Sequence, residues 1–337
     1  MAIHEYGVDR RTMLKTLGSV AAGLTFSRVG FAGVPSNSTT KSLRGLFPIG
    51  QSPFTEDDKL DLGCLAAEVN FCNRAGVPGF IWPQIASGWS TLSTSERFAG
   101  TEAILAAGKG GKTALVIGAQ TKGNDLPGAI AYAKHAAQNG ADAICSLPPR
   151  GDSAAVLNYY QAIGNATDLP LFVQTTGDMP VDLVLELFRS VPTMRVVKDE
   201  AGDPLQRVTE IREKTGDKLA VFAGNGVRLM IDEMRLGFAG YCPTVGLSDL
   251  YQEAFVLYKA GKRREAFDMF GRILAFSSIP QSDKYLLVAR GIFKENTKSR
   301  PMPGMGQAAD KQLPLNENDK KVIREALDTY LKPYLRG

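Results

Sequence analysis

The sequence is poor in histidine, which excludes several kinds of catalytic machinery. Only His4 and His135 occur in 337 residues. A Ser-His-Asp or Cys-His site would have to depend on His135, because His4 lies in a segment that we expect to be removed. His135 falls within a helical pattern at residues 127–139, where a structural role is the better interpretation.

The cysteines are also few, and none stands in a CxxC pair. They are Cys64, Cys72, Cys145 and Cys242. Such wide spacing indicates neither a zinc site nor a dense disulfide framework, so we expect four buried thiols. Neither GxxxxGKS/T nor GxGxxG follows a strand, so nucleotide and dinucleotide sites have no support. We therefore expect no cofactor and no metal.

The chain lacks a strong charge bias and a long apolar run. Its formal net charge is +4, and no basic stripe is interleaved with aromatic residues, so nucleic acid is not an expected partner. The apolar stretch Thr16–Leu24 is too short, and too rich in Gly, Ala and Ser, to span a bilayer, so stable membrane insertion is not expected. With 44% hydrophobic and 22% charged residues, the chain can bury a full core.

What the first forty residues do contain is the pattern of a bacterial twin-arginine export signal. Arg10 and Arg11 precede a weakly apolar stretch, and Gly30-Phe31-Ala32 supplies small residues where a signal peptidase reads them. We predict a signal peptide at residues 1–32, a linker at 33–42 and a periplasmic mature protein. The alternative is a disordered basic N-terminus with a chance arginine pair.

The remainder alternates short apolar runs with amphipathic patterns, which indicates parallel strands joined by crossover helices. Strands are expected at Gly45–Pro48, Gly79–Trp82, Ala114–Gly118, Ala143–Ser146, Leu171–Gln174, Met194–Lys198, Leu219–Ala223 and Ala239–Pro243. Helices between them are expected at about Asp57–Ala75, Ser93–Ala107, Pro127–Asn139, Ala154–Gly164, Pro180–Ser190, Pro204–Thr215 and Val227–Leu236. Eight such units predict a (β/α)8 TIM barrel at residues 43–248.

After the eighth strand the pattern is wholly helical, at about residues 249–277, 283–293 and 319–334, with a Pro- and Gly-bearing linker at 300–315. We therefore predict a C-terminal helical extension at residues 249–337. It packs on the barrel or on another subunit.

One stretch, Thr193–Asp203, delivers a lysine to a loop. The apolar run Met194–Val197 indicates a buried strand, and the charges, Gly202 and Pro204 that follow indicate a tight turn into a helix. In a parallel barrel, that turn is where catalytic groups lie. We predict that burial lowers the preference of Lys198 for its charged form, so that its amine attacks a carbonyl and forms an imine. The alternative is a solvated lysine at the end of a strand.

Four runs of residues stand in a specific order around this barrel. They are Pro48-Ile49-Gly50-Gln51-Ser52-Pro53-Phe54, Val196-Val197-Lys198-Asp199 with Gly202-Asp203, Phe222-Ala223-Gly224-Asn225, and Arg300-Pro301. With them the chain resembles, from Leu43 to its C-terminus, the dihydrodipicolinate synthase and N-acetylneuraminate lyase family of Schiff-base class I aldolases. The resemblance implies that Lys198, at the C-terminal end of strand six, is the imine-forming lysine for a small carbonyl substrate. It also implies a homo-oligomer, either a tetramer or a dimer.

Two stretches depart from the family's pattern. Where the family carries Gly-Thr-Thr-Gly-Glu after the second strand, this chain reads Gln84-Ile85-Ala86-Ser87-Gly88. The backbone at Ala86 and the hydroxyl of Ser87 are the candidates left to hold a substrate carboxylate. Where the family presents a proton-relaying tyrosine after strand four, this chain reads Ser146-Leu147-Pro148-Pro149-Arg150. Tyr159 and Tyr160 come later, on the following helix, and are assigned to the core or the surface.

The remaining polar candidates lie after strands four, five and seven. Arg150 either pairs with a substrate carboxylate in a fork or is an ordinary exposed arginine. Gln174, Thr175 and Asn225 complete the predicted substrate-binding set.

Aromatic and apolar residues gather in the second loop, namely Trp82, Ile85 and Trp89. An aromatic mouth with few hydroxyls suits a larger or more apolar carbonyl compound than pyruvate. The equally supported alternative is that both tryptophans pack under the loop.

Two functions stay open. The first is a lyase or aldolase that forms an imine between Lys198 and a 2-oxo acid or related carbonyl compound, and then makes or breaks a bond beside the imine carbon or eliminates water. The second is an exported, catalytically reduced barrel that binds a small acid or sugar-like ligand. The presence of Lys198 favours the enzyme, because a buried lysine with no chemistry to perform is costly to keep unpaired. The missing threonines and tyrosine favour the binding protein.

Overall fold

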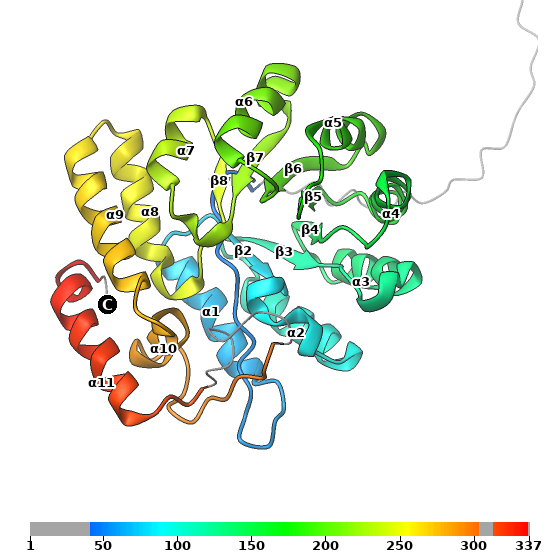
Figure 1. Ribbon diagram of the computed structural model, residues 1–337. Helices are drawn as coiled ribbons and strands as arrows, with labels where there is room; N and C mark the ends of the chain where they lie inside the picture. Colours follow the sequence, from blue (N-terminus) through cyan, green and yellow to red (C-terminus); the bar gives the residue numbers. More distant parts are fainter. Residues whose placement is uncertain (1–40, 303–312, 336–337) are drawn as a thin grey trace, which may run out of the picture. The chain divides into compact units, whose positions relative to one another are not determined.

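The computed structural model describes residues 41–302 and 313–335. The predicted signal peptide at 1–32 lies outside the described residues, as does the predicted linker at 33–42 apart from its last two residues. The described part of the chain is a (β/α)8 barrel followed by further helices, as predicted (Figure 1).

Eight parallel strands form the wall of the barrel. They are β1 (Gly45–Leu46), β2 (Gly79–Trp82), β3 (Ala114–Gly118), β4 (Ala143–Ser146), β5 (Leu171–Gln174), β6 (Met194–Asp199), β7 (Ala220–Ala223) and β8 (Gly240–Tyr241). Their order around the sheet is β1-β8-β7-β6-β5-β4-β3-β2. A bridge between Ile49 and Ile81 joins the two ends of that sheet. All eight predicted strands are present, and the first and last are shorter than predicted.

Three phenylalanine rings fill the inside of the barrel. Phe47, Phe172 and Phe222 contact one another, with ring centroids 5.2 to 5.7 Å apart. Glycines on the neighbouring strands make room for them, because a Cβ at Gly79 would lie 2.1 Å from the Phe47 ring and one at Gly240 would lie 2.3 Å from Phe222. The interior is therefore a packed core and not a channel.

Eight helices cover the outside of the strands (Figure 1). They are α1 (Leu62–Arg74), α2 (Thr94–Ala107), α3 (Leu126–Gln138), α4 (Ser153–Gly164), α5 (Val181–Ser190), α6 (Pro204–Thr215), α7 (Met230–Leu236) and α8 (Ser248–Lys259). Five of them begin at a side chain that accepts a backbone N–H of the first turn, namely Asp61, Ser93, Asp125, Asp152 and Asp203. Since α8 follows β8, it completes the eighth βα pair, and the barrel runs past the boundary predicted at residue 248.

Two helices begin later than predicted because the chain turns first. Before α1, the backbone N–H of Thr55 donates to the carbonyl of Lys59 at 2.8 Å and closes a turn. Before α7, Asn225, Gly226 and Val227 have φ angles of 50, 73 and 55°, which a right-handed helix excludes. Both turns lie at the C-terminal ends of strands, where the connections shape the mouth of the barrel.

Three further helices follow α8: α9 (Arg263–Ser277), α10 (Ser282–Ala289) and α11 (Glu317–Ala326). Helix α9 packs against α8, and α11 packs against α10 (Figure 1). The single helical segment predicted at 249–277 is divided into α8 and α9 at Gly261, whose φ is 79°. Arg290, directly after α10, donates to both carboxylate oxygens of Asp249 on α8, at 2.9 and 2.7 Å. A buried ion pair thus fastens the end of α10 to α8, the last helix of the barrel. Within residues 41–302 and 313–335, no helix is both long and apolar enough to cross a membrane.

Candidate active site

Lys198 lies where the sequence places it, at the C-terminal end of β6. It stands opposite Gln174 on β5 and Phe222 on β7. Val196, two residues earlier on the same face of the strand, belongs to the inner core, so the Lys198 side chain is also directed inward. Only 8% of Lys198 is exposed. The prediction of a buried lysine is confirmed, and the alternative of a solvated lysine is wrong.

The carboxylate of Glu200 is the partner of the Lys198 ammonium group. Nζ of Lys198 lies 3.1 Å from Oε1 of Glu200. The same carboxylate accepts the backbone N–H of Asn225 at 2.9 Å and the side-chain amide Nε2 of Gln174. Gly224 leaves room for this arrangement, because a Cβ there would lie 1.6 Å from Oε1 of Glu200. Residues from the ends of three adjacent strands therefore hold one ion pair.

The charge state of Lys198 differs from the prediction. Burial alone would lower the pKa of its ammonium group, but the Glu200 carboxylate raises it, and the net shift is upward. Thiolates at Cys242 and Cys145 would act in the same direction. Burial raises the pKa of both thiols to about 12, however, so they are neutral at pH 7 and Glu200 is the effective cause. Lys198 is thus held charged, and the expectation of a lysine that has lost its preference for the charged form is wrong.

Thr175 fixes the loop after β6. Its buried hydroxyl donates to Oδ1 of Asp199 at 2.7 Å and accepts the N–H groups of Glu200 and Ala201 at 2.9 and 3.1 Å. Arg207 binds the same carboxylate of Asp199 through two nitrogens, at 2.9 and 2.8 Å. The hydroxyl of Thr175 therefore positions the backbone that carries Glu200, and its contact with substrate stays a prediction.

Ser87 is likewise used by the protein itself. Its hydroxyl donates to the carbonyl of Gly50 at 2.5 Å and accepts the N–H of Gln84 at 2.9 Å. These bonds fasten the turn after β2 to the loop after β1, and they leave no hydroxyl hydrogen for a substrate. That Ser87 lends its hydroxyl to a substrate stays a prediction, and it would require the bond to Gly50 to open. Ala86 is half-buried and packs against the inner core, so its backbone stays the candidate at this turn.

The two tryptophans occupy different environments. The indole N–H of Trp82 donates to Oγ of Ser52 at 3.1 Å, and a Cβ at Gly100 would lie 2.3 Å from the ring. Trp82 is completely buried and points toward α2, so for this residue the packing alternative is correct. Trp89 lies at the mouth of the barrel, where it lines a cleft with Leu147.

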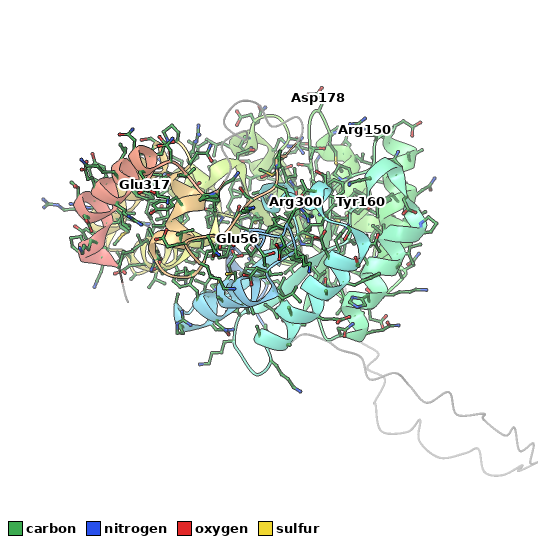
Figure 2. All side chains as sticks on the ribbon, turned by 90° about the horizontal axis from the view of Figure 1, so that it is seen from below. Glu56, Arg150, Tyr160, Asp178, Arg300 and Glu317 are labelled. Carbon is green, nitrogen blue, oxygen red and sulfur yellow. The ribbon has the colours of Figure 1, made fainter. Side chains whose placement is uncertain are left out.

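This mouth cleft has a volume of about 490 Å³ and lies between the β3–α3 and β4–α4 loops. Lys122 and Arg150 line it, and both side chains are exposed. Neither of them forms an ion pair with a residue in the described ranges. Figure 2 shows Arg150 at the same edge of the barrel as Asp178, which comes from the neighbouring β5–α5 loop. The cleft therefore combines an aromatic wall with two available positive charges.

Buried amides connect the mouth cleft to the Lys198 site. Gln120 lines the cleft, and its Oε1 lies 3.5 Å from Nε2 of Gln84. The same Nε2 of Gln84 donates to the Sγ of Cys145 at 2.9 Å. The side-chain oxygens of Gln84 and Gln174 are buried and have no hydrogen-bond partner among the described residues. Two unfilled acceptors favour a bound molecule that carries hydrogen-bond donors.

The tyrosines of α4 have structural partners. The hydroxyl of Tyr160 donates to the carbonyls of Ser146 and Gln174, at 2.8 and 3.2 Å. The hydroxyl of Tyr159 lies 2.8 Å from Oγ of Ser146, at the edge of the mouth cleft. Burial raises the pKa of Tyr159 to about 12. Both residues belong to the core, and both hydroxyls are bonded within the protein.

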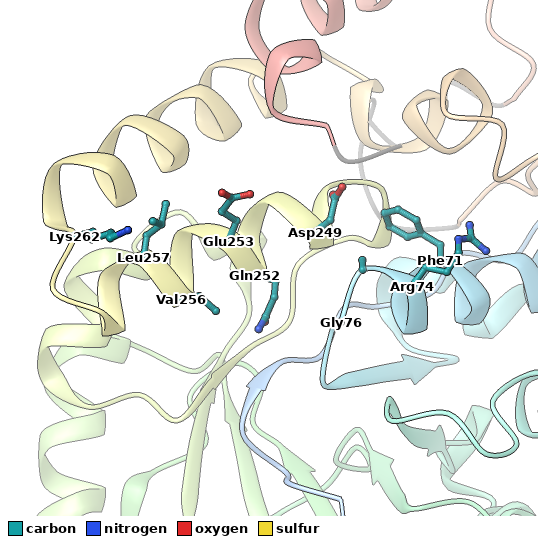
Figure 3. A pocket seen from close by; sticks show the side chains of 10 residues that line it. Phe71, Arg74, Gly76, Asp249, Gln252, Glu253, Val256, Leu257 and Lys262 are labelled. Atoms are coloured by element: carbon teal, nitrogen blue, oxygen red, sulfur yellow. The ribbon is translucent and has the colours of Figure 1, made fainter.

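A second pocket, of about 540 Å³, lies outside the barrel between the end of α1 and α8 (Figure 3). Phe71, Arg74, Asp249 and Gln252 are among its lining residues. Its lysine, Lys262, is exposed and therefore solvated. This pocket is larger than the mouth cleft, and Lys198 lines neither of them. The chemistry favours the mouth because Lys198 lies at the C-terminal end of β6, the end of the barrel at which catalytic groups gather.

Two further predicted features, the buried thiols and the structural role of His135, agree with the structure. The four cysteines are buried free thiols. His135 lies on α3 with Nε2 3.0 Å from Oε1 of Glu102, in the outer layer of helices. No three His, Cys, Asp or Glu side chains in the described ranges gather in a way that would hold a metal ion.

Of the predicted site residues, the structure brings Lys198, Gln174 and Asn225 together. Asn225 contributes its backbone N–H, while its side chain is exposed. Sequence reasoning missed Glu200. The sequence did contain a signal for Glu200. Residues two apart in extended backbone point to the same face, and Glu200 follows Lys198 by two residues, directly after the end of β6.

Comparisons with known proteins show the family to which the chain belongs. Residues 42–307 match the model of the dihydrodipicolinate synthetase family. The 4-hydroxy-tetrahydrodipicolinate synthase of Methanosarcina mazei is 30% identical over 200 residues, which cover 56% of this chain and 66% of that protein. The synthase of Chloroherpeton thalassium is 27% identical over 260 residues, covering 72% and 84%. The first match thus spans just under two thirds of that relative's length.

Solved structures share the fold at low identity. An N-acetylneuraminate lyase from Mycoplasma synoviae superposes with a TM-score of 0.74 at 19% identity, over 86% of this chain and 98% of that one. A dihydrodipicolinate synthase from Rhodopseudomonas palustris superposes with a TM-score of 0.72 at 20% sequence identity, over 87% of this chain and 98% of that one. These likenesses concern the arrangement of the barrel and its helices.

The hydrogen bonds of Thr175 predict a measurable loss of stability on substitution. Thr175→Val leaves two buried N–H groups and one carboxylate oxygen without this partner, so we expect the free energy of unfolding to fall by about 2–3 kcal/mol. Thr209→Val is the matched control, because that exposed hydroxyl only reaches the Leu205 carbonyl at 3.4 Å. Urea unfolding of both variants measures the difference. Equal losses would show that Thr175 does not hold the loop.

Proposed function

Because the chain belongs to the dihydrodipicolinate synthetase family, we propose that it is a lyase-type enzyme that joins Lys198 to a carbonyl substrate as a Schiff base. Family membership supports a class I aldolase or lyase. The observation that carries the proposal is the buried Lys198 amine at the C-terminal end of β6, on the face where barrel enzymes build their sites. The imine withdraws electrons from the neighbouring carbon, so that a bond beside it is made or broken, or water is eliminated.

The substrate proposed is a 2-oxo acid or related carbonyl compound that is bulkier than pyruvate. Ser87 offers no free hydroxyl hydrogen to a small carboxylate at the turn after β2, since it donates to the carbonyl of Gly50. The mouth cleft offers an aromatic wall at Trp89, and Lys122 and Arg150 can pair with an acidic group at the far end of the molecule. These features favour a longer substrate that spans from Lys198 to the cleft.

A second candidate function is a barrel that binds a small acid or sugar-like ligand without turnover. The charged state of Lys198 favours it, because a protonated amine is not a nucleophile and Glu200 already pairs with it. The two functions differ in whether a covalent bond to Lys198 forms.

Reductive trapping separates these two functions. Incubation with a panel of carbonyl compounds and borohydride is expected to add a reduced adduct at Lys198, located by peptide mass spectrometry. Lys198→Ala is expected to abolish adduct and turnover, whereas Lys214→Ala serves as control because that lysine is exposed on α6 and paired with Glu210. Pyruvate is expected to bind some thirtyfold more weakly than the preferred compound, which corresponds to about 2 kcal/mol for one lost hydrogen bond to a charged group.

Two results would count against the enzyme. If the folded protein is not trapped at Lys198 by any compound of a broad panel, the binding function takes its place. If pyruvate is trapped as readily as every bulkier compound, the proposed substrate class is wrong.

We also propose that the mature protein is periplasmic, starts near Gly33 and is exported by the twin-arginine pathway. The support is the sequence pattern around Arg10 and Arg11. Replacing both arginines with lysine is expected to retain the precursor in the cytoplasm, as measured by cell fractionation and immunoblotting. If the variant still reached the periplasm through that pathway, or the native protein never left the cytoplasm, the export proposal would be withdrawn.

A homo-oligomer, either a tetramer or a dimer, is proposed from the family resemblance. Val256 on α8 and Phe267 on α9 are 53% and 57% exposed, and they offer apolar contact surface. Light scattering on the mature protein at micromolar concentration is expected to give two or four times the mass of one chain. A strictly monomeric mass contradicts the proposal.

A further inference from the structure

We propose that Glu200 is the general acid and base for imine formation at Lys198. The inference rests on the proposed Schiff-base function and names the group that moves its protons. The Glu200 carboxylate lies 3.1 Å from Nζ of Lys198, the atom that must lose protons before and after it attacks a carbonyl. It thereby supplies what the tyrosine absent after β4 would provide.

The carboxylate is held independently of the lysine's charge. Its two oxygens accept the backbone N–H of Asn225 and the side-chain amide of Gln174, and both of these donors are neutral. Thr175 binds the backbone N–H of Glu200 itself. A proton-transfer group has to stay in place while its partner changes charge, and these bonds keep Glu200 in place when Lys198 becomes neutral.

The other titratable groups near Lys198 are unsuited to the task. Those that act on it electrostatically are Glu200 from its own strand end, Cys242 after β8 and Cys145 on β4. Both thiols are neutral because burial raises their pKa to about 12. Asp199 is engaged by Arg207 and Thr175. Glu200 is therefore the carboxylate available to Nζ within the described part of the chain.

The proton path balances over four steps. The Lys198 ammonium gives a proton to Glu200. The resulting amine attacks the carbonyl carbon while Glu200 passes that proton to the carbonyl oxygen. The nitrogen, now positively charged, returns one proton to the carboxylate. Glu200 then protonates the hydroxyl of the carbinolamine, the carbon–oxygen bond breaks, water leaves, and the nitrogen lone pair closes the protonated imine. Glu200 ends as the carboxylate with which it began.

The substitution Glu200→Gln distinguishes this role from that of a counter-ion. Because Glu200 raises the pKa of Lys198, its removal leaves more neutral amine at a given pH. A mere counter-ion would thus slow imine formation, and Glu200→Gln would accelerate trapping at pH 7. As the acid and base, Glu200 is instead required, so we expect trapping to slow by about a hundredfold at every pH from about 6 to 9.

The experiment uses the full-length protein and has two readouts. Rapid-quench borohydride trapping with one carbonyl compound gives the rate of imine formation across pH. Carbamoylation of Lys198 by cyanate, followed by mass spectrometry, reports the neutral amine without any substrate, and it is expected to be faster in Glu200→Gln. Glu210→Gln is the matched control, because Glu210 pairs with exposed Lys214 at 2.9 Å, and its trapping rate is expected to equal that of the wild type.

Each outcome has one meaning. If the wild type is trapped and Glu200→Gln is trapped at an equal or higher rate, the role of Glu200 is overturned and the Schiff-base function stays intact. No wild-type trapping with any compound overturns both. Should Glu200→Gln fail to fold, Glu200→Asp carries the test, because it withdraws the carboxylate from Nζ by one methylene. A Glu200→Asp rate equal to the wild type then overturns the proposal.

Discussion

A charged amine enclosed by a barrel needs an opposite charge nearby, and the Lys198–Glu200 pair meets this constraint at the mouth. An unpaired buried charge costs several kcal/mol, so the surrounding residues are arranged to keep the carboxylate close. Gly224 has no side chain that would displace it, and Gln174 and the backbone of Asn225 bind its oxygens. The ends of β5, β6 and β7 are thus one electrostatic unit, and the chemistry available to the lysine is set by that unit more than by burial alone.

Much of the fold was predictable because strands buried on both faces are continuous apolar runs. Gly79–Trp82, Ala114–Gly118, Ala143–Ser146 and Leu171–Gln174 have the bounds that the sequence indicated. The starts of α1 and α7 were not predictable. Local propensity cannot anticipate the hydrogen bond from Thr55 to Lys59, nor the left-handed backbone at Val227, a β-branched residue that rarely adopts it. Tertiary context decided both cases.

The candidate site divides in the same way. Lys198 was predictable because it follows a buried run, whereas the partners of the Ser87 and Thr175 hydroxyls were not predictable because they are distant in sequence. Ser87 bonds to a carbonyl 37 residues away, and Thr175 to a carboxylate 24 residues away. A sequence shows which side chains can form hydrogen bonds, but only the fold shows which of them are already engaged. The charge of Lys198 was misjudged for a different reason: its counter-ion Glu200 is only two residues away, and that signal was overlooked.

The layer of phenylalanine rings determines from which end of the barrel a molecule can reach Lys198. Phe172 and Phe222 precede Gln174 and Gly224 by one inward-facing position, so the rings lie on the N-terminal side of the ion pair. Because the rings fill the N-terminal side, a molecule can reach and leave Lys198 only from the C-terminal end of the barrel. Under the proposed function, a cleavage with two products would release first the fragment that is not bonded to nitrogen, and the bonded fragment would block the next substrate until water frees it. Accumulating product would then compete with substrate for that end of the barrel, so the proposed reaction would slow unless its product is carried away.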